Sequence, residues 1–93
     1  MILRQIGEKQ FEWFHHFLLE GARADPMNAI YTVNLKINDV EYDVKLLLEE
    51  ENQIAILQAT RIDRGKYGSD FELITDDKLL SSFLEILLYQ GPC

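Results

Sequence analysis

The sequence predicts an α+β fold in which an N-terminal and a C-terminal helix pack on a single-layer antiparallel sheet of three to four strands. Apolar side chains recur at helical spacing near the start and near the end of the chain. Between these segments, apolar and polar residues alternate, which is typical of strands with one covered and one wet face. We therefore expect the order α-β-β-β-(β)-α in a single compact domain over residues 1-93, because 93 residues are too few for two ordinary domains.

The first helix is expected at about residues 7-24. One face of this segment is apolar at the spacing i, i+3, i+7, through Phe11, Phe14, Phe17 and Leu18. Gly21 and the pair Asp25-Pro26 are stop signals, because proline disfavours the helical conformation in the residue before it.

The strands are expected at about residues 30-37, 40-48 and 53-61. Asn38-Asp39 separates the first two segments and tolerates left-handed backbone, so these two segments should form a β-hairpin. The third segment also contains Ala55, Gln58 and Ala59, which suit a helix as well as a strand. Residues 61-69 are expected to form a loop, and residues 71-74 are a candidate for a fourth, short edge strand.

The last helix is expected at about residues 76-90, with Thr75 or Asp76 as its cap. It is apolar over most of its circumference, so it needs cover on more than one side. Two alternatives remain open for this excess of apolar surface. The helix lies in the core of a thin domain, or it forms a homodimer interface through Leu80, Leu84, Leu87 and Leu88.

Composition and motifs argue against several classes of protein. The chain has 16 acidic and 9 basic residues and a net charge of −7, which argues against direct binding of nucleic acid through phosphates. No apolar run reaches the roughly 18 residues of a membrane span. The single cysteine, Cys93, cannot form an internal disulfide, which favours a reducing, cytoplasmic setting. Phosphate-binding glycine motifs, zinc motifs and nucleophile motifs are missing, so we expect neither an enzyme nor a cofactor.

The first candidate for a partner contact is the segment 61-68, where three of the nine basic residues lie close together in an acidic chain. Such side chains can hold an anion or an acidic protein surface, here through Arg61, Arg64, Lys66 and Tyr67. The alternative is local charge balance across a hairpin, against Glu49, Glu50 and Glu51.

A secondary candidate contact is formed by the acidic residues of the predicted hairpins, namely Asp39, Glu41, Asp43, Glu49, Glu50 and Glu51. Charges of this kind usually keep a protein soluble. They can also imitate the spacing of phosphates and steer association with a basic, nucleic-acid-handling protein.

Glu12, His16 and Glu20 share one face of the first helix, since each lies four residues from the next. Carboxylate and imidazole groups at this spacing can offer ligands to a divalent ion. A solvated helix face with i, i+4 partners explains the same spacing, and we expect no metal site here.

Two families resemble parts of this pattern. The order α-β-β-β-α resembles the double-stranded RNA-binding domain, but Thr75-Asp76-Asp77-Lys78 stands where that family has basic residues. Leu35-Lys36-Ile37-Asn38-Asp39-Val40 and the leucine-rich segment 79-89 resemble the front half of acidic type III secretion chaperones, which implies a dimer that holds effector proteins. Those chaperones continue with further strands and a helix, and we assign the chain to neither family.

Together these observations favour a small, acidic, non-enzymatic protein-binding module. It would act as a stoichiometric inhibitor, immunity or anti-defence type protein that occupies the functional surface of another, basic or nucleic-acid-handling protein. The alternative is a homodimeric chaperone or adaptor that uses the apolar C-terminal helix. A metal-binding or enzymatic domain built on Glu12, His16 and Glu20 is the third hypothesis.

Overall fold

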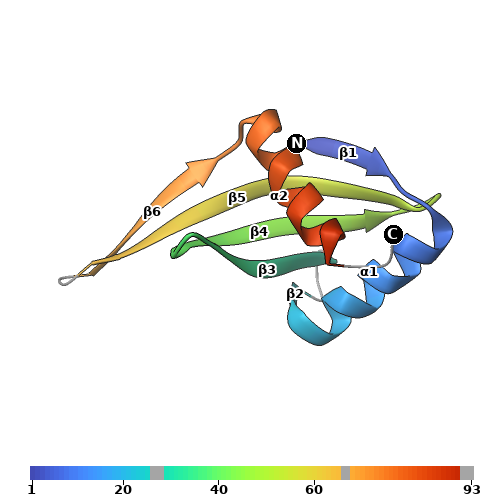
Figure 1. The fold of residues 1–93 in the computed structure, drawn as a ribbon, viewed down its shortest axis with the longest axis horizontal. Helices are drawn as coiled ribbons and strands as arrows, with labels where there is room; N and C mark the ends of the chain where they lie inside the picture. Colours follow the sequence, from blue (N-terminus) through green and yellow to red (C-terminus); the bar gives the residue numbers. More distant parts are fainter. Residues whose placement is uncertain (26–28, 66–67, 91–93) are drawn as a thin grey trace.

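The computed structural model of the chain describes residues 1–25, 29–65 and 68–90, which form an antiparallel sheet and two helices (Figure 1). The elements are, in order, β1 (Ile2–Gln5), α1 (Glu8–Gly21), β2 (Arg23–Asp25), β3 (Ile30–Ile37), β4 (Val40–Glu49), β5 (Gln53–Gly65), β6 (Gly68–Ile74) and α2 (Asp77–Tyr89). The α+β class with its antiparallel sheet and two helices is thus confirmed, but the chain begins with the strand β1 rather than with a helix. The predicted number of strands is wrong, because the sheet has six strands rather than three to four.

The two strands that sequence analysis missed flank the first helix. β1 has four residues and β2 has three, so neither is long enough to show a clear alternation of apolar and polar residues. α1 ends at Gly21, and Ala22 is already extended, which lets β2 occupy residues that were predicted to be helical.

β5 organises the sheet, because it pairs with other strands along both of its edges. The strand order is β1-β5-β4-β3-β2, and β6 also pairs with β5. β1 pairs with Gln53–Ile56 and β6 pairs with residues 59–65, so these two strands lie end to end along one edge of β5. The ambiguous segment 53-61 is therefore a strand, and the predicted loop over 61-69 is wrong, since β5 continues to Gly65 and β6 begins at Gly68.

Both helices pack against the same face of the sheet, which we call the helix face. α1 contributes Phe14 and Leu18 to a single core, with Phe11 and Phe17 packed against it. The core side chains of the sheet and of α2 are Val33, Leu35, Val44, Leu46, Ile54, Ile56, Ala59, Leu80, Phe83, Leu84, Leu87 and Leu88. The apolar side chains of α2 are explained by this shared core, because they fill the space between the helix and the strands β3, β4 and β5.

The opposite face, which we call the open face, is covered by no helix in the described part of the chain (Figure 1). Side chains of β3 and β4 that alternate with the core residues point to it, namely Thr32, Asn34, Lys36, Glu41, Asp43 and Lys45. This confirms the predicted pattern of one covered and one wet face.

The sheet extends beyond the helices at the end where β5 and β6 turn, and the hairpin of these strands projects away from α2 on the left of Figure 1. The molecule is accordingly elongated, with extents of 45 × 29 × 23 Å. No helix within the described ranges is long and apolar enough to cross a membrane.

Candidate functional site

A hydrogen-bonded network of charged side chains crosses the open face near the projecting end of the sheet. Strand register creates it: Asn34 on β3 lies opposite Asp43 on β4, and Glu41 lies two residues before Asp43 on the same face. Arg64 reaches Glu41 from β5 through two contacts, Nε to Oε2 at 2.8 Å and Nη2 to Oε1 at 3.2 Å. Arg23 reaches Asp43 from β2, with Nη2 at 3.1 Å from Oδ2. We call these five residues the open-face network.

Asn34 joins the two halves of the network. Its Nδ2 donates to Oε1 of Glu41 at 2.8 Å and to Oδ1 of Asp43 at 3.0 Å. The hydrogen bonds from Arg64 and then from Asn34 lower the pKa of Glu41 from its ordinary 4.5 to about 2. The same contact with Glu41 raises the pKa of Arg64. Both carboxylates are therefore held in place, and their side chains are only 22% and 23% exposed.

Two shallow depressions flank the network. One, of about 350 Å³, lies at the turn end of the sheet between Glu41, Arg64 and Asp63. The other, of about 390 Å³, lies beside Arg23 and Asp43. Their charged rims consist of carboxylate and cationic side chains, which can form charge-assisted hydrogen bonds.

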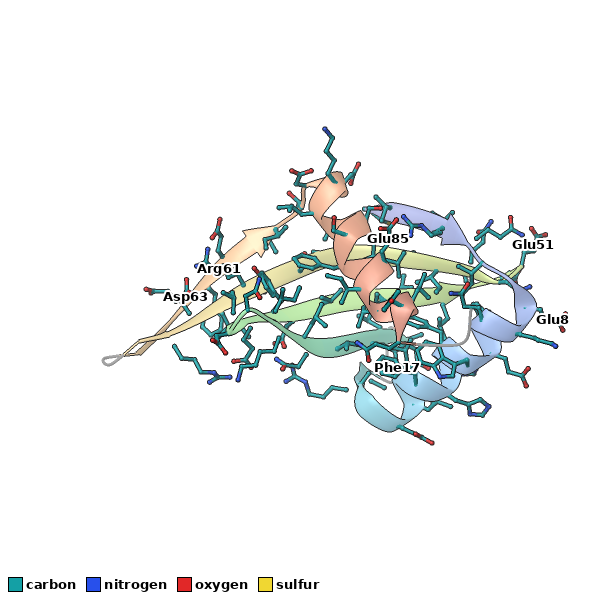
Figure 2. All side chains as sticks on the ribbon, in the orientation of Figure 1. Glu8, Phe17, Glu51, Arg61, Asp63 and Glu85 are labelled. Atoms are coloured by element: carbon teal, nitrogen blue, oxygen red, sulfur yellow. The ribbon has the colours of Figure 1, made fainter. Side chains whose placement is uncertain are left out.

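The predicted basic segment does not form one basic surface. Arg64 points to the open face, whereas Arg61 lies on the helix face, with its Nε 3.4 Å from Oδ1 of Asp63 and its Nη1 4.0 Å from Oε2 of Glu72. Lys66 and Tyr67 lie outside the described residues. The alternative that Glu49, Glu50 and Glu51 balance these arginines is wrong, because Glu51 and Arg61 lie at opposite ends of the sheet (Figure 2).

The six acidic residues predicted as a secondary contact likewise separate into two groups. Asp39, Glu41 and Asp43 lie at the projecting end, where Asp39 lines the first depression. Glu49, Glu50 and Glu51 are exposed at the turn between β4 and β5, where the backbone oxygen of Glu51 accepts a hydrogen bond from Gln5 at 3.3 Å.

The four leucines predicted as a dimer interface are part of the core. Leu80, Leu84 and Leu87 are fully buried and Leu88 is almost so, because this side of α2 packs against the sheet. The prediction that they face a second subunit is therefore wrong. The exposed apolar side chains of α2 lie elsewhere on the helix, at Leu79, Ile86 and Tyr89.

Glu12, His16 and Glu20, which were weighed as metal ligands but for which no metal site was expected, lie on the exposed surface of α1. Within residues 1–25, 29–65 and 68–90, no three His, Cys, Asp or Glu side chains gather in a way that could hold a metal ion.

The exposed apolar side chains along the β6 edge were not among the predicted site residues. Phe71 lies opposite Ile62 on β5 and Leu73 lies opposite Thr60, which places both on the open face. Phe71 is 67% exposed and Leu73 is 59% exposed. The alternation in Phe71-Glu72-Leu73-Ile74 indicated the strand, but only the register with β5 shows that Phe71 and Leu73 share the open face.

Comparisons of the chain with protein-family models, with curated proteins and with solved structures found no match.

Proposed function

We propose that the chain is a non-enzymatic protein-binding module that inhibits a basic partner protein by occupying its functional surface in a fixed stoichiometry. The contact element is the projecting hairpin of β5 and β6. One observation carries this proposal: the hairpin extends beyond the helices with large apolar side chains exposed on one face and carboxylates on the other.

Phe71 and Leu73 supply the apolar part of the contact. Both side chains are more than half exposed to water, and covering such apolar surface with a partner is favourable. Aromatic residues are also frequent among the side chains that dominate the binding energy of protein interfaces. Their strand is held by seven register pairs to β5, so they are presented by a rigid element rather than by a free loop.

The charge of the helix face of this hairpin favours a basic partner. Asp63, Asp70 and Glu72 lie on this face, and among the described residues Arg61 is the cation that forms ion pairs with two of them. The net charge of −7 adds a long-range attraction for a positively charged protein.

The test is affinity capture from the native host with the immobilised chain, at low and at high salt, with bound proteins identified by mass. We expect a salt-sensitive complex of defined stoichiometry that the double variant Phe71→Ser/Leu73→Ser no longer captures. Leu19→Ser is the matched control, because Leu19 is an apolar residue on α1 with 57% exposure. Capture by the hairpin variant at the wild-type level would contradict the proposal.

The second candidate function is a homodimeric adaptor that uses the outer surface of α2. It is favoured by the exposed side chains of Leu79, Ile86 and Tyr89 and by a hollow of about 340 Å³ beside the last two. Sedimentation at micromolar concentration distinguishes the two candidates. A dimer that Ile86→Ser/Tyr89→Ser dissociates would support the adaptor, and a strict monomer would exclude it.

A further inference from the structure

The geometry points to the outer edge of β6 as an acceptor for an extended peptide segment of alternating basic and apolar residues, which would add to the sheet as one more strand. This inference rests on the proposed function and names the chemistry of the partner segment.

The first observation is the state of the edge itself. In the described part of the chain β6 pairs with β5 alone, and Figure 1 shows its other edge facing away from the rest of the sheet. Edge strands present unpaired N–H and C=O groups, and proteins usually blunt them with charged residues, especially lysine, with proline or with short length. β6 has seven residues and contains neither lysine nor proline, and its two charged residues, Asp70 and Glu72, are both acidic, so they would repel an acidic strand but not a basic one. Its backbone is therefore a suitable template for another strand.

The second observation is the alternation of side chains along β6. Phe71 and Leu73 point to the open face, whereas Asp70 and Glu72 point to the helix face. Residues directly opposite each other in neighbouring strands share a face and interact in pairs. An added strand would therefore place apolar side chains beside Phe71 and Leu73, and basic side chains beside Asp70 and Glu72.

The third observation is the charge around this edge. Asp63 on β5 lies opposite Asp70, and Arg61 lies opposite Glu72. Three carboxylates, those of Asp63, Asp70 and Glu72, thus share this face with one guanidinium among the described residues, that of Arg61, which lies 3.4 Å from Asp63 and 4.0 Å from Glu72. Lysine or arginine on an incoming strand would complement this excess of negative charge.

The same charges argue against a second copy of the chain as the occupant. Two β6 strands that pair antiparallel about a two-fold axis have their open faces on the same side. In one register Asp70 lies opposite Glu72 of the other copy, and in another register the Glu72 side chains of the two copies lie opposite each other. Like charges directly opposite each other destabilise a strand pair. A basic segment of another protein avoids this repulsion.

The other end of the same sheet edge is a poorer acceptor. β1 has four residues, and its Arg4 donates to Oγ of Ser81 on α2 at 2.6 Å. The N-terminal amine lies 3.3 Å from Asp77 at the start of α2. These contacts with α2 leave less room for an added strand at β1 than at β6.

The probe is a capped peptide of alternating lysine and valine residues, as long as β6. The measurement is two-dimensional NMR of the full chain, with amide exchange, at increasing peptide concentration. We expect shifts and slower amide exchange confined to β6 and its neighbours. A peptide of the same composition with the lysines in one block, and an alternating peptide with N-methylated backbone, should bind at least tenfold more weakly.

Variants of the protein test whether the acidic side chains of β6 contribute to binding of the basic peptide. Asp70→Asn/Glu72→Gln should weaken binding of the alternating peptide by about tenfold, because two cross-strand charge pairs are lost. Glu12→Gln/Glu20→Gln on α1 removes the same charge elsewhere and should leave binding almost unchanged. Equal binding of the block and N-methylated peptides, or equal effects of the two double variants, would overturn the inference.

The outcomes also separate this inference from the proposed function. If host capture depends on Phe71 and Leu73 but the peptides neither bind nor slow amide exchange in β6, the hairpin binds a partner without strand addition. If the alternating peptide binds as expected but no host complex forms, strand addition stands and the inhibitory role fails.

Discussion

The ion pair of Glu41 with Arg64 couples the stability of the fold to pH. The folded chain lowers the pKa of Glu41 from 4.5 to about 2, so the folded state holds the ionised carboxylate more firmly than the unfolded state does. The pair therefore stabilises the fold above pH 4.5, and this contribution is lost as the pH falls toward 2. Salt weakens it further, because Arg64 is largely exposed.

We predict that Arg64→Gln raises the pKa of Glu41 toward its ordinary value. NMR titration of the side-chain carboxyl carbon measures this directly, and urea unfolding at neutral and acidic pH measures its effect on stability. The difference in stability between wild type and variant should shrink as the pH falls below 4.5. Lys9→Gln on α1 is the control for the loss of one positive charge. A wild-type Glu41 that titrates near 4.5 would contradict the prediction.

Turn residues could be predicted from the sequence, but the partners of charged residues could not. Asn38 and Asp39 adopt φ values of 49° and 67°, which is the left-handed turn that this dipeptide predicts. Arg64 and Glu41 are 23 residues apart and meet only because β4 and β5 pair in one particular register. That register is set by the whole sheet, so local sequence does not reveal it.

The cap of α2 is a local contact with a measurable contribution. Oδ1 of Asp76 accepts a hydrogen bond from the backbone N–H of Lys78 at 2.9 Å, which identifies Asp76 rather than Thr75 as the cap. Asp76→Ala should lower the free energy of unfolding by about 1 kcal/mol, because this N–H loses its acceptor. Asp76→Asn keeps an acceptor and should cost much less. Urea unfolding of both variants checks the prediction, and equal losses would point to charge rather than capping.

The buried face of α2 should control stability rather than assembly. Leu84 is fully buried between α2 and the sheet, so Leu84→Ala should lower the free energy of unfolding by about 2–5 kcal/mol. Leu79→Ala, on the exposed side of the same helix, should change it by less than about 0.5 kcal/mol. Urea unfolding compares the two variants. Unchanged stability of Leu84→Ala would place this leucine outside the core.

The helices were predictable because their apolar spacing extends over several turns, and the strands of the central hairpin because their alternation is regular. The pattern of β5 is different. Between Lys45 and Leu46 the register with β4 shifts, so the core residues of β5 change from Ile54 and Ile56 to Ala59. This bulge interrupts the alternation along the strand, which is why the segment suited a helix as well as a strand.

The arrangement of the whole sheet separates charges that are neighbours in the sequence. Arg61 and Arg64 are three residues apart but lie on opposite faces, and each pairs with carboxylates of its own face. Composition alone correctly gives a net charge of −7, but it does not reveal that Asp63, Asp70 and Glu72 share one face of the β5–β6 hairpin. Only the long pairing of β5 with both β4 and β6 places them there.

This distribution of charge predicts the oligomeric state of the molecule. The wild-type chain should not associate through its β6 edge at micromolar concentration, because pairing of two β6 edges would bring Asp70 opposite Glu72 of the other copy. Asp70→Lys should strengthen self-association about tenfold or more, since two-fold symmetry then creates two opposite-charge pairs in place of two repulsive ones. Glu20→Lys on α1 makes the same change in net charge away from the edge and should not strengthen self-association. If Glu20→Lys dimerises as strongly as Asp70→Lys, net charge rather than the β6 edge controls association.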